Sequence, residues 1–327
     1  MVIVIFQQDR FIRQVTSLII VGILAVVSIF IGVQNLTLVD LFSLTDSQRI
    51  VLFSTRIPRT ISLILAGATL SVSGLLMQQL TQNKFVSPTT AGTMSSARLG
   101  VVLALVLFGS QTFFHQILFA FLFATVGTFI FTLFLRQIKS NRSIMVPLVG
   151  MMLGNIIGSV GTFFALRYEV VQNVTSWLQG NFSMVSSSNY LLIYLAIPIL
   201  IVIYLFAHYF TVMSLGKDIV TELGVSYHRI ELIGIVVVAL GTTAVLLTAG
   251  SIPFLGIIVP NLVAMKVGDN FRQILFPTAV IGAGFTLISD MVARLVIYPY
   301  ELPISVVIGI FGSILFLYLL LRGEHHV

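Results

Sequence analysis

Few side chains in this sequence have the types and spacing that chemistry needs, and Asp290 and Arg294 form the most suggestive pair. They stand four residues apart, so on a helix both lie on one face and can form an ion pair. Charged residues within an apolar, membrane-spanning segment are usually functional. The pair is therefore interpreted in two ways, as a functional site or as a structural ion pair that fastens the end of a helix.

Motifs and residue spacings typical of catalysis or metal binding are otherwise missing. The chain has no cysteine, so it has neither a thiol nucleophile nor a cysteine zinc site. Gly216-Lys217-Asp218 lacks the upstream glycine and the following Ser or Thr of an ATP-binding P-loop. The histidines show no metal-ligand spacing: His115, His208 and His228 lie near the ends of apolar stretches, and His325 and His326 form a tail pair. The sequence thus predicts no catalytic residue, no metal site and no cofactor.

The elements that must position these side chains are membrane helices. Of the 327 residues, 57% are hydrophobic and 9% are charged, whereas soluble domains carry about 25% charged residues. The mean hydropathy is +1.08, and no stretch is polar enough to form a second domain. We expect an all-α, polytopic membrane protein in which residues 1–327 form a single transmembrane domain.

Ten apolar stretches approach the roughly 20 residues that cross a bilayer as a helix. They are residues 15–33, 60–79, 91–108, 113–135, 144–166, 190–209, 230–249, 250–266, 274–293 and 303–321, and residues 167–189 are predicted to form a long loop. A signal peptide is the rival interpretation of the first stretch. That stretch is too long for one, and no small-residue cleavage site follows it.

Basic residues are distributed unevenly over the predicted loops. Ten spans place both termini on one side, and twelve Lys and Arg fall there: Arg10, Arg13, Lys84, Arg98, Arg136, Lys139, Arg142, Lys217, Arg229, Lys266, Arg272 and Arg322. Five fall on the other side: Arg49, Arg56, Arg59, Arg167 and Arg294. The positive-inside rule therefore places both termini in the cytoplasm. This asymmetry explains the net charge of +6, so no nucleic-acid partner is needed.

One apolar stretch is interrupted in a way that is typical of transport proteins. Residues 250–261 contain two glycines and two prolines, and proline disrupts a helix because it lacks a backbone donor. In a membrane, the freed carbonyl groups must be satisfied by neighbouring helices or by a water-lined cavity. A short, broken span is therefore a pointer to transport.

Gly150, Gly154 and Gly158 repeat at four-residue intervals along one face of the fifth stretch. Small residues at this spacing let two helices approach closely. Packing within the chain is at least as good an interpretation as a subunit interface or the wall of a pathway. Gly67, Ser71 and Gly74 repeat the pattern less regularly in the second stretch and are likewise interpreted as packing residues.

Residues of about 214–226 form a short polar stretch that is predicted to be an amphipathic helix. Its polar residues are Lys217, Asp218, Thr221 and Glu222, its apolar residues are Ile219, Val220 and Leu223, and Gly224 stands where a helix cap would. One interpretation is a helix that lies on the membrane surface. The other is a coupling helix that docks into a cytoplasmic motor protein, which would supply the energy source that the spans lack.

The sequence resembles a known family, the FecCD-type permeases of ABC importers for iron-siderophores, haem and cobalamin. The resemblance rests on Arg56-Ile57-Pro58-Arg59-Thr60 leading into Ala66-Gly67-Ala68 and Ser73-Gly74, on Leu215-Gly216 to Leu223-Gly224, on Gly250 to Pro260, and on Asp290 to Arg294 with Glu301-Leu302-Pro303-Ile304. These motifs follow one another in the family's order through nearly the whole chain.

The resemblance implies a ten-helix permease with the type II ABC importer fold, paired with an identical or a sister permease. Two cytoplasmic ATPase subunits and an extracytoplasmic substrate-binding protein would complete the importer in a bacterial cytoplasmic membrane, with the pathway between the two permeases. The implied residues for ATPase coupling are Leu215, Gly216, Lys217, Asp218, Glu222, Leu223 and Gly224, and those for docking of the binding protein are Arg56, Arg59 and Arg294.

The sequence departs from many family members at one position, where Val259-Pro260-Asn261 replaces Val-Pro-His. This variant is similar to the subgroup that imports ferric catecholate or mixed catecholate siderophores, so an iron(III)-siderophore is the expected cargo. Within the family, a haem or cobalamin permease is the alternative. Outside it, the alternative is an ion-coupled secondary carrier, although the middles of the first seven spans lack the acids that such carriers ordinarily use. A membrane enzyme is a more distant alternative.

Overall fold

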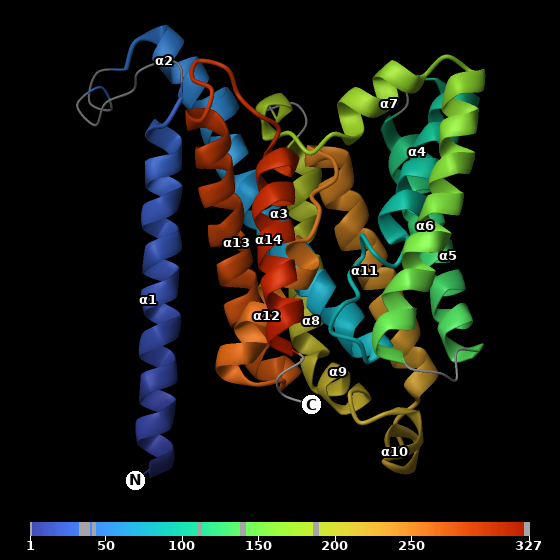
Figure 1. The fold of residues 1–327 in the computed structure, drawn as a ribbon. Coiled ribbons are helices and arrows are strands. Elements are labelled where there is room, and N and C mark those ends of the chain that lie inside the picture. The colour runs from blue at the N-terminus through green and yellow to red at the C-terminus, as the bar shows by residue number, and fades with distance from the viewer. Residues whose placement is uncertain are drawn as a thin grey trace.

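The computed structural model describes residues 2–32, 40, 44–109, 113–137, 142–185 and 190–323, and within these ranges the chain is helical, with no β-strand. The helices are α1 Val2–Phe30, α2 Asp46–Val51, α3 Ile57–Thr81, α4 Thr93–Phe108, α5 Phe113–Gln137, α6 Arg142–Arg167, α7 Val171–Leu178, α8 Ala196–Leu205, α9 Ala207–Met213, α10 Lys217–Glu222, α11 Tyr227–Ala249, α12 Leu255–Val267, α13 Phe271–Leu295 and α14 Ile304–Gly323. The all-α fold class is confirmed (Figure 1).

The predicted apolar stretches correspond to helices of three kinds. Within the described ranges, six helices are long and apolar enough to cross a membrane, and α8 and α9 belong to one further span that bends by 60°. Three apolar helices are shorter: α4, α12 and the 304–319 part of α14. Together they match the ten predicted segments. The long loop predicted at 167–189 is wrong in one respect, because it contains α7.

The chain between α3 and α4 explains why α4 is short. Val86, Ser87 and Ala91 are all at most 1% exposed, so this connection runs inside the bundle and not over its surface. Its last residue, Gly92, lies beside Gly154, near the middle of α6. Helix α4 therefore begins deep within the bundle and needs only part of the membrane thickness to reach its far end.

Helix α3 lies at the centre of the bundle, where the most apolar part of its span is 83% buried. Its neighbours come so close that a Cβ atom on Gly74 would lie 2.0 Å from the carbonyl oxygen of Gly256 in α12. A Cβ atom on Gly67 would lie 2.4 Å from the carbonyl oxygen of Gly282 in α13. Only glycine permits such backbone contact, so the predicted packing role of the second stretch is confirmed.

The interrupted segment forms a kinked entry into α12. Gly250 and Phe254 adopt left-handed backbone conformations with φ values of +79° and +62°, and α12 starts directly afterwards. The neighbouring end of α7 pairs with backbone groups that the break leaves without a helical partner. The amide of Ser251 donates to the carbonyl of Leu178 at 3.1 Å. The amide of Asn181 donates to Ala249 at 2.9 Å. A neighbouring segment thus replaces the hydrogen bonds that the break removes, as the sequence predicts.

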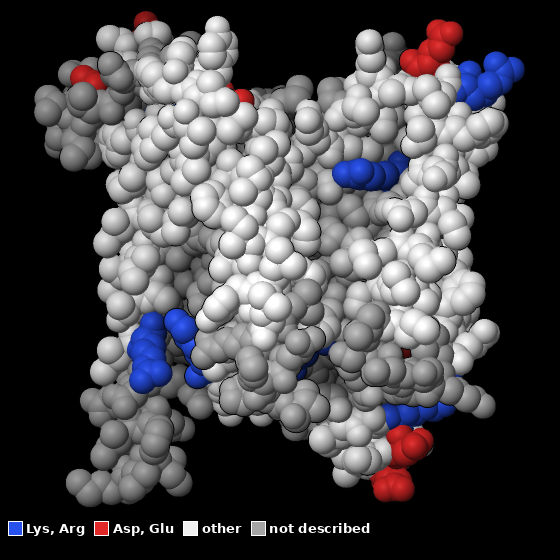
Figure 2. Space-filling view, viewed as in Figure 1, with Lys and Arg blue, Asp and Glu red and all other residues white. Residues whose placement is uncertain are grey.

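The two ends of the bundle carry different elements. Helix α1 begins and α14 ends at the lower side of Figure 1, which we call the terminal side, and α10 lies there too. Helices α2 and α7 lie at the opposite side. Charged side chains gather towards these two sides and leave the middle of the visible face largely uncharged (Figure 2). This distribution is the one that a bilayer imposes on a spanning protein.

Candidate functional site

The predicted pair of Asp290 and Arg294 forms part of a larger network at the opposite side. Arg294 Nη2 lies 2.7 Å from Asp290 Oδ2, so the predicted ion pair is confirmed. Arg59 from α3 binds the other carboxylate oxygen of Asp290 at 2.7 Å and Glu301 at 2.8 Å. We call Arg56, Arg59, Asp290, Arg294 and Glu301 the arginine network. Asp290 is only 1% exposed, so its charge depends on these partners.

The arginine network also fastens α1 to the bundle. Arg294 donates to the carbonyls of Ser28 and Ile31 at 2.9 and 2.7 Å, and Arg56 donates to the carbonyl of Ile29 at 2.6 Å. These carbonyls belong to the last turn of α1 and the residue after it, where intrahelical donors run out. Arginine suits this position because its five donors can serve a carboxylate and several carbonyls together.

Glu301 closes the arginine network from the loop between α13 and α14. It accepts hydrogen bonds from Arg59 and from the hydroxyl of Ser183, which follows α7. Burial alone would raise the pKa of the Glu301 carboxyl, but the Arg59 guanidinium and the Ser183 hydroxyl together lower the pKa below its ordinary value. Sequence motifs include Glu301 and Arg59 but do not show that they touch.

The structure brings the predicted docking residues Arg56, Arg59 and Arg294 together in this network. Arg56 and Arg294 are 8% and 4% exposed, and the Arg59 side chain is 12% exposed. All three therefore have structural partners within the chain. Their role in docking a second protein is a separate question and stays a prediction.

The predicted coupling stretch contains the expected short helix on the terminal side. Helix α10 begins after Gly216, whose φ is +96°, and the chain leaves it through Gly224, whose φ is +75°. Val220 is fully buried and anchors the helix, while Leu215, Ile219 and Leu223 are 54%, 47% and 60% exposed. Ile219 lies on the helix, Leu223 directly follows it and Leu215 precedes Gly216, so exposed apolar side chains mark α10 and both of its ends. Lys217, Asp218 and Glu222 are exposed as well.

Asn261 has a structural task close to the terminal side. Its side-chain amide donates to the carbonyl of Ile257, one turn back in α12, and to the carbonyl of Lys84, both at 2.8 Å. Lys84 in turn pairs with Asp269 at 2.9 Å across the surface. Asn261 thus ties α12 to the connection that leads into α4. Its relation to the cargo stays a prediction.

A cavity of about 1040 Å³ lies between α4, α6 and α7. Its walls include Gly154, Gly158 and Arg98. We call it the α6 cavity. Gly150 lies outside it and packs tightly, since a Cβ atom there would lie 2.2 Å from the carbonyl oxygen of Thr90. A Cβ atom on Gly158 would meet nothing within 4 Å. The glycine repeat therefore divides between helix packing at one end and a cavity wall at the other.

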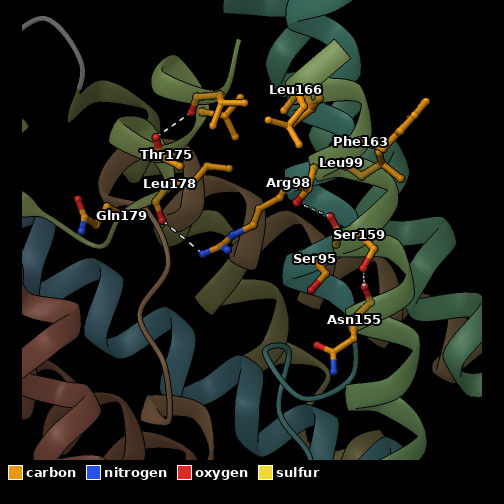
Figure 3. A pocket seen from close by; sticks show the side chains of 18 residues that line it. Ser95, Arg98, Leu99, Asn155, Ser159, Phe163, Leu166, Thr175, Leu178 and Gln179 are labelled. Atoms are coloured by element: carbon orange, nitrogen blue, oxygen red, sulfur yellow. Dashed lines mark hydrogen bonds between the residues drawn. The ribbon is translucent and has the colours of Figure 1, made fainter. Parts of the chain in front are cut away.

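The position of Arg98 corrects the charge count of the sequence. It was counted with the loops of the terminal side, but Arg98 extends from α4 towards the carbonyl of Leu178, at the end of α7 and away from that side (Figure 3). The error arises because the connection before α4 is buried, so that residues near the start of α4 are already deep in the bundle. Eleven of the twelve basic residues remain assigned to the terminal side.

Comparison with known proteins places the whole arrangement in one family. The model of the FecCD transport family matches residues 18–322. The chain belongs to the FecCD transport family.

Individual relatives agree with this membership. The chain is 48% identical over 302 residues to the petrobactin import system permease protein YclN of Bacillus subtilis, covering 92% of this chain and 96% of that protein. It is 38% identical to the petrobactin import system permease protein FatD of Bacillus anthracis, covering 94% and 90%. A metal-chelate type ABC transporter solved in an inward-facing conformation matches with a TM-score of 0.81 and 25% identity, covering 94% of this chain and 98% of that chain.

Proposed function

We propose that this FecCD-family chain is the transmembrane permease subunit of an ATP-driven ABC importer that moves an iron(III)-siderophore across the cytoplasmic membrane of a bacterium. The observation that carries the proposal is the 48% identity to a petrobactin import permease over 92% of this chain. The match to a metal-chelate type transporter over nearly the whole fold supports the same class of cargo. The chain acts in transport, and ATP hydrolysis belongs to a partner.

The ATPase partner fits the exposed ridge of α10. Leu215, Ile219 and Leu223 present apolar surface on the terminal side, and Lys217, Asp218 and Glu222 surround it with charge. An apolar centre with a polar rim is the usual composition of a protein interface. Two such ATPase subunits would bind a pair of permeases, which are either identical or sister chains. Closure of the ATPase subunits would then be transmitted to the permease through their contact with α10.

The orientation of the chain follows from its charges. With Arg98 assigned to the bundle interior, eleven Lys and Arg belong to the terminal side and five to the opposite side. The positive-inside rule then gives cytoplasmic N- and C-termini. In that orientation, α10 faces the cytoplasm, where ATP is available, and the arginine network faces outward.

An extracytoplasmic binding protein would deliver the cargo at the arginine network. Within the arginine network, the three cations Arg56, Arg59 and Arg294 outnumber the two carboxylates of Asp290 and Glu301. Charges at a docking surface chiefly raise the rate of association. The same residues hold α1, α3 and α13 together, so a docking partner would act on a rigid part of the chain.

Uptake into vesicles tests the proposed function. The chain is reconstituted into vesicles with its candidate ATPase and binding protein. Import of an iron(III)-siderophore is measured with and without ATP on the side of the membrane where the ATPase subunits bind. Uptake that requires ATP and both partners is the expected result. Uptake by this chain alone, driven by an ion gradient, would favour a secondary carrier and contradict the proposal. Haem and cobalamin serve as competing cargoes in the same assay.

A further inference from the structure

Arg98 is a cation within the bundle that the proposed docking and coupling surfaces do not use. Its Nη2 group donates to the carbonyl of Leu178 at 3.4 Å, which is long for such a bond. Its Nε group is buried and has no hydrogen-bond partner among the described residues. It is also the only charged residue among those that line the α6 cavity. The cavity wall thus holds one incompletely satisfied positive charge.

This charge cannot be removed by losing a proton, because arginine stays protonated in proteins. Within the described part of the chain, no carboxylate lies within ion-pair distance of Arg98. Arg98 is partly buried, and its buried Nε group is costly as long as it has no hydrogen-bond partner. By contrast, two other arginines near the spans, Arg59 and Arg294, are paired with Asp290. Arg98 therefore lacks the internal counter-ion that a purely structural arginine would have.

Helix α6 contributes a polar edge to another wall of the same cavity. Asn155, Ser159 and Thr162 line the cavity at spacings of four and three residues, and all three residues are exposed at the surface of this chain. Exposed polar side chains near the middle of a spanning helix face a cavity or another protein rather than lipid. The absence of a side chain on Gly158 leaves the space between them open.

We propose that the α6 cavity is a binding site for an anionic metal chelate, with Arg98 as the residue that selects for negative charge. The guanidinium supplies charge-assisted hydrogen bonds to the anionic oxygens of the chelate, and Asn155, Ser159 and Thr162 bind its other polar groups. The volume of about 1040 Å³ is at the upper end of ligand pockets, which run to roughly 1,000 Å³. This inference rests on the proposed transport of metal chelates and adds the charge class of the cargo.

Binding to the full-length chain in phosphatidylcholine nanodiscs tests the inference. The probes are an anionic iron(III)–tris(catecholate) complex and an uncharged iron(III)–tris(hydroxamate) complex, each labelled with radioactive iron and measured by equilibrium dialysis. Wild-type protein is expected to prefer the anionic probe. Arg98→Gln should weaken binding of the anionic probe by roughly tenfold or more, as expected for the loss of a charged hydrogen-bond donor. It should leave the uncharged probe unaffected, while Arg98→Lys should retain most of the preference.

Arg167→Gln is the matched control, since it removes an exposed arginine at the end of α6 that does not line the cavity. Its anionic binding should equal that of wild type. Gly158→Leu is a second, independent variant that fills the cavity without meeting a described neighbour within 4 Å of the new Cβ atom. It should weaken binding of both probes. If Arg98→Gln fails to fold, binding to Gly158→Leu alone tests whether the probes occupy the cavity.

Three results of the binding assay without added lipid would overturn the inference. They are no binding of the anionic probe to wild type, an equal effect of Arg98→Gln on both probes, or unchanged binding in Gly158→Leu. Displacement of the anionic probe by added phosphatidylglycerol in wild type but not in Arg98→Gln would assign the cavity to a lipid headgroup instead. ATP-dependent uptake that persists with unaltered charge preference in Arg98→Gln would refute this inference and leave the proposed function intact.

Discussion

The carboxylate of Asp290 in α13 accepts two hydrogen bonds from the guanidinium of Arg59 in α3, through Nε at 3.2 Å and Nη2 at 2.7 Å, across 231 residues of sequence. Asp290 also pairs with Arg294, one turn away. One buried carboxylate thus pairs with cations from two helices, and Glu301 supplies Arg59 with a second negative partner. The geometry explains how charges so close to the membrane are tolerated, because each has a partner.

Removal of Arg59 should destabilise the chain. Arg59→Gln removes one of the two cations that pair with Asp290 and also the ion pair of Arg59 with Glu301. Breaking a buried pair costs about 3–5 kcal/mol. The thermal midpoint of unfolding, measured in nanodiscs, should fall clearly. Arg49→Gln is the control, since Arg49 is exposed on α2 and should leave the midpoint unchanged. Equal midpoints for wild type and Arg59→Gln would show that the network adds no stability.

Glu301 should make stability depend on acidic pH. The pKa of Glu301 is lowered below its ordinary value of 4.5 in the folded chain. The unfolded state therefore binds a proton first, so the stabilisation is complete above 4.5 and is lost as the pH falls from there through the folded pKa. The loss of thermal midpoint between pH 5 and pH 3 should be smaller in Glu301→Gln than in wild type. Parallel pH profiles would contradict the assignment.

Charges on the exposed ridge of α10 should uncouple ATP hydrolysis from transport. Ile219 and Leu223 are 47% and 60% exposed, so Ile219→Asp with Leu223→Asp should leave the fold intact. Cargo-stimulated ATP turnover by the assembled importer should fall by roughly tenfold or more, as expected for the loss of apolar interface anchors. Ile50→Asp, a 64% exposed position on α2 at the opposite side, is the control. Full turnover in the double variant would exclude α10 as the coupling element.

The contact between α3 and α12 should tolerate no side chain. A Cβ atom on Gly74 would lie 2.0 Å from the carbonyl oxygen of Gly256, so Gly74→Ala must push two backbones apart. Overpacking of this kind costs about 1–3 kcal/mol or more. Gly22→Ala in α1 meets nothing within 4 Å and is the control. The yield of monodisperse protein and its thermal midpoint should fall only for Gly74→Ala.

Arg56 should influence docking of the binding protein through charge. Arg56→Gln removes one cation from the arginine network while leaving the pair of Arg59 and Asp290 in place. The association rate at low salt should fall severalfold, and the difference should shrink at high salt because ions screen the attraction. Surface plasmon resonance with immobilised permease measures both rates. Association rates that match wild type at every salt concentration would remove Arg56 from the docking surface.

Much of the fold could be predicted because hydropathy and helix signals are local properties of the chain. The apolar stretches, the helix at 217–222 and the ion pair of Asp290 with Arg294 all depend on residues close in sequence. Helix α7 was not predicted, because residues 171–178 are too few and too mixed to stand out from a loop. Arg98 was assigned to the wrong place for a related reason. A buried connection looks like any other polar turn until its contacts are known.

The sequence by itself determined that the chain is an all-α membrane protein, where its spans lie, and which motifs relate it to the FecCD transport family. Those properties follow from composition, periodicity and order along the chain. The tertiary structure alone decided that Arg59 meets both Asp290 and Glu301. It alone left Arg98 without a counter-ion among the described residues, beside an open Gly158. Such pairings depend on how helices pack across hundreds of residues, and no local pattern encodes that geometry.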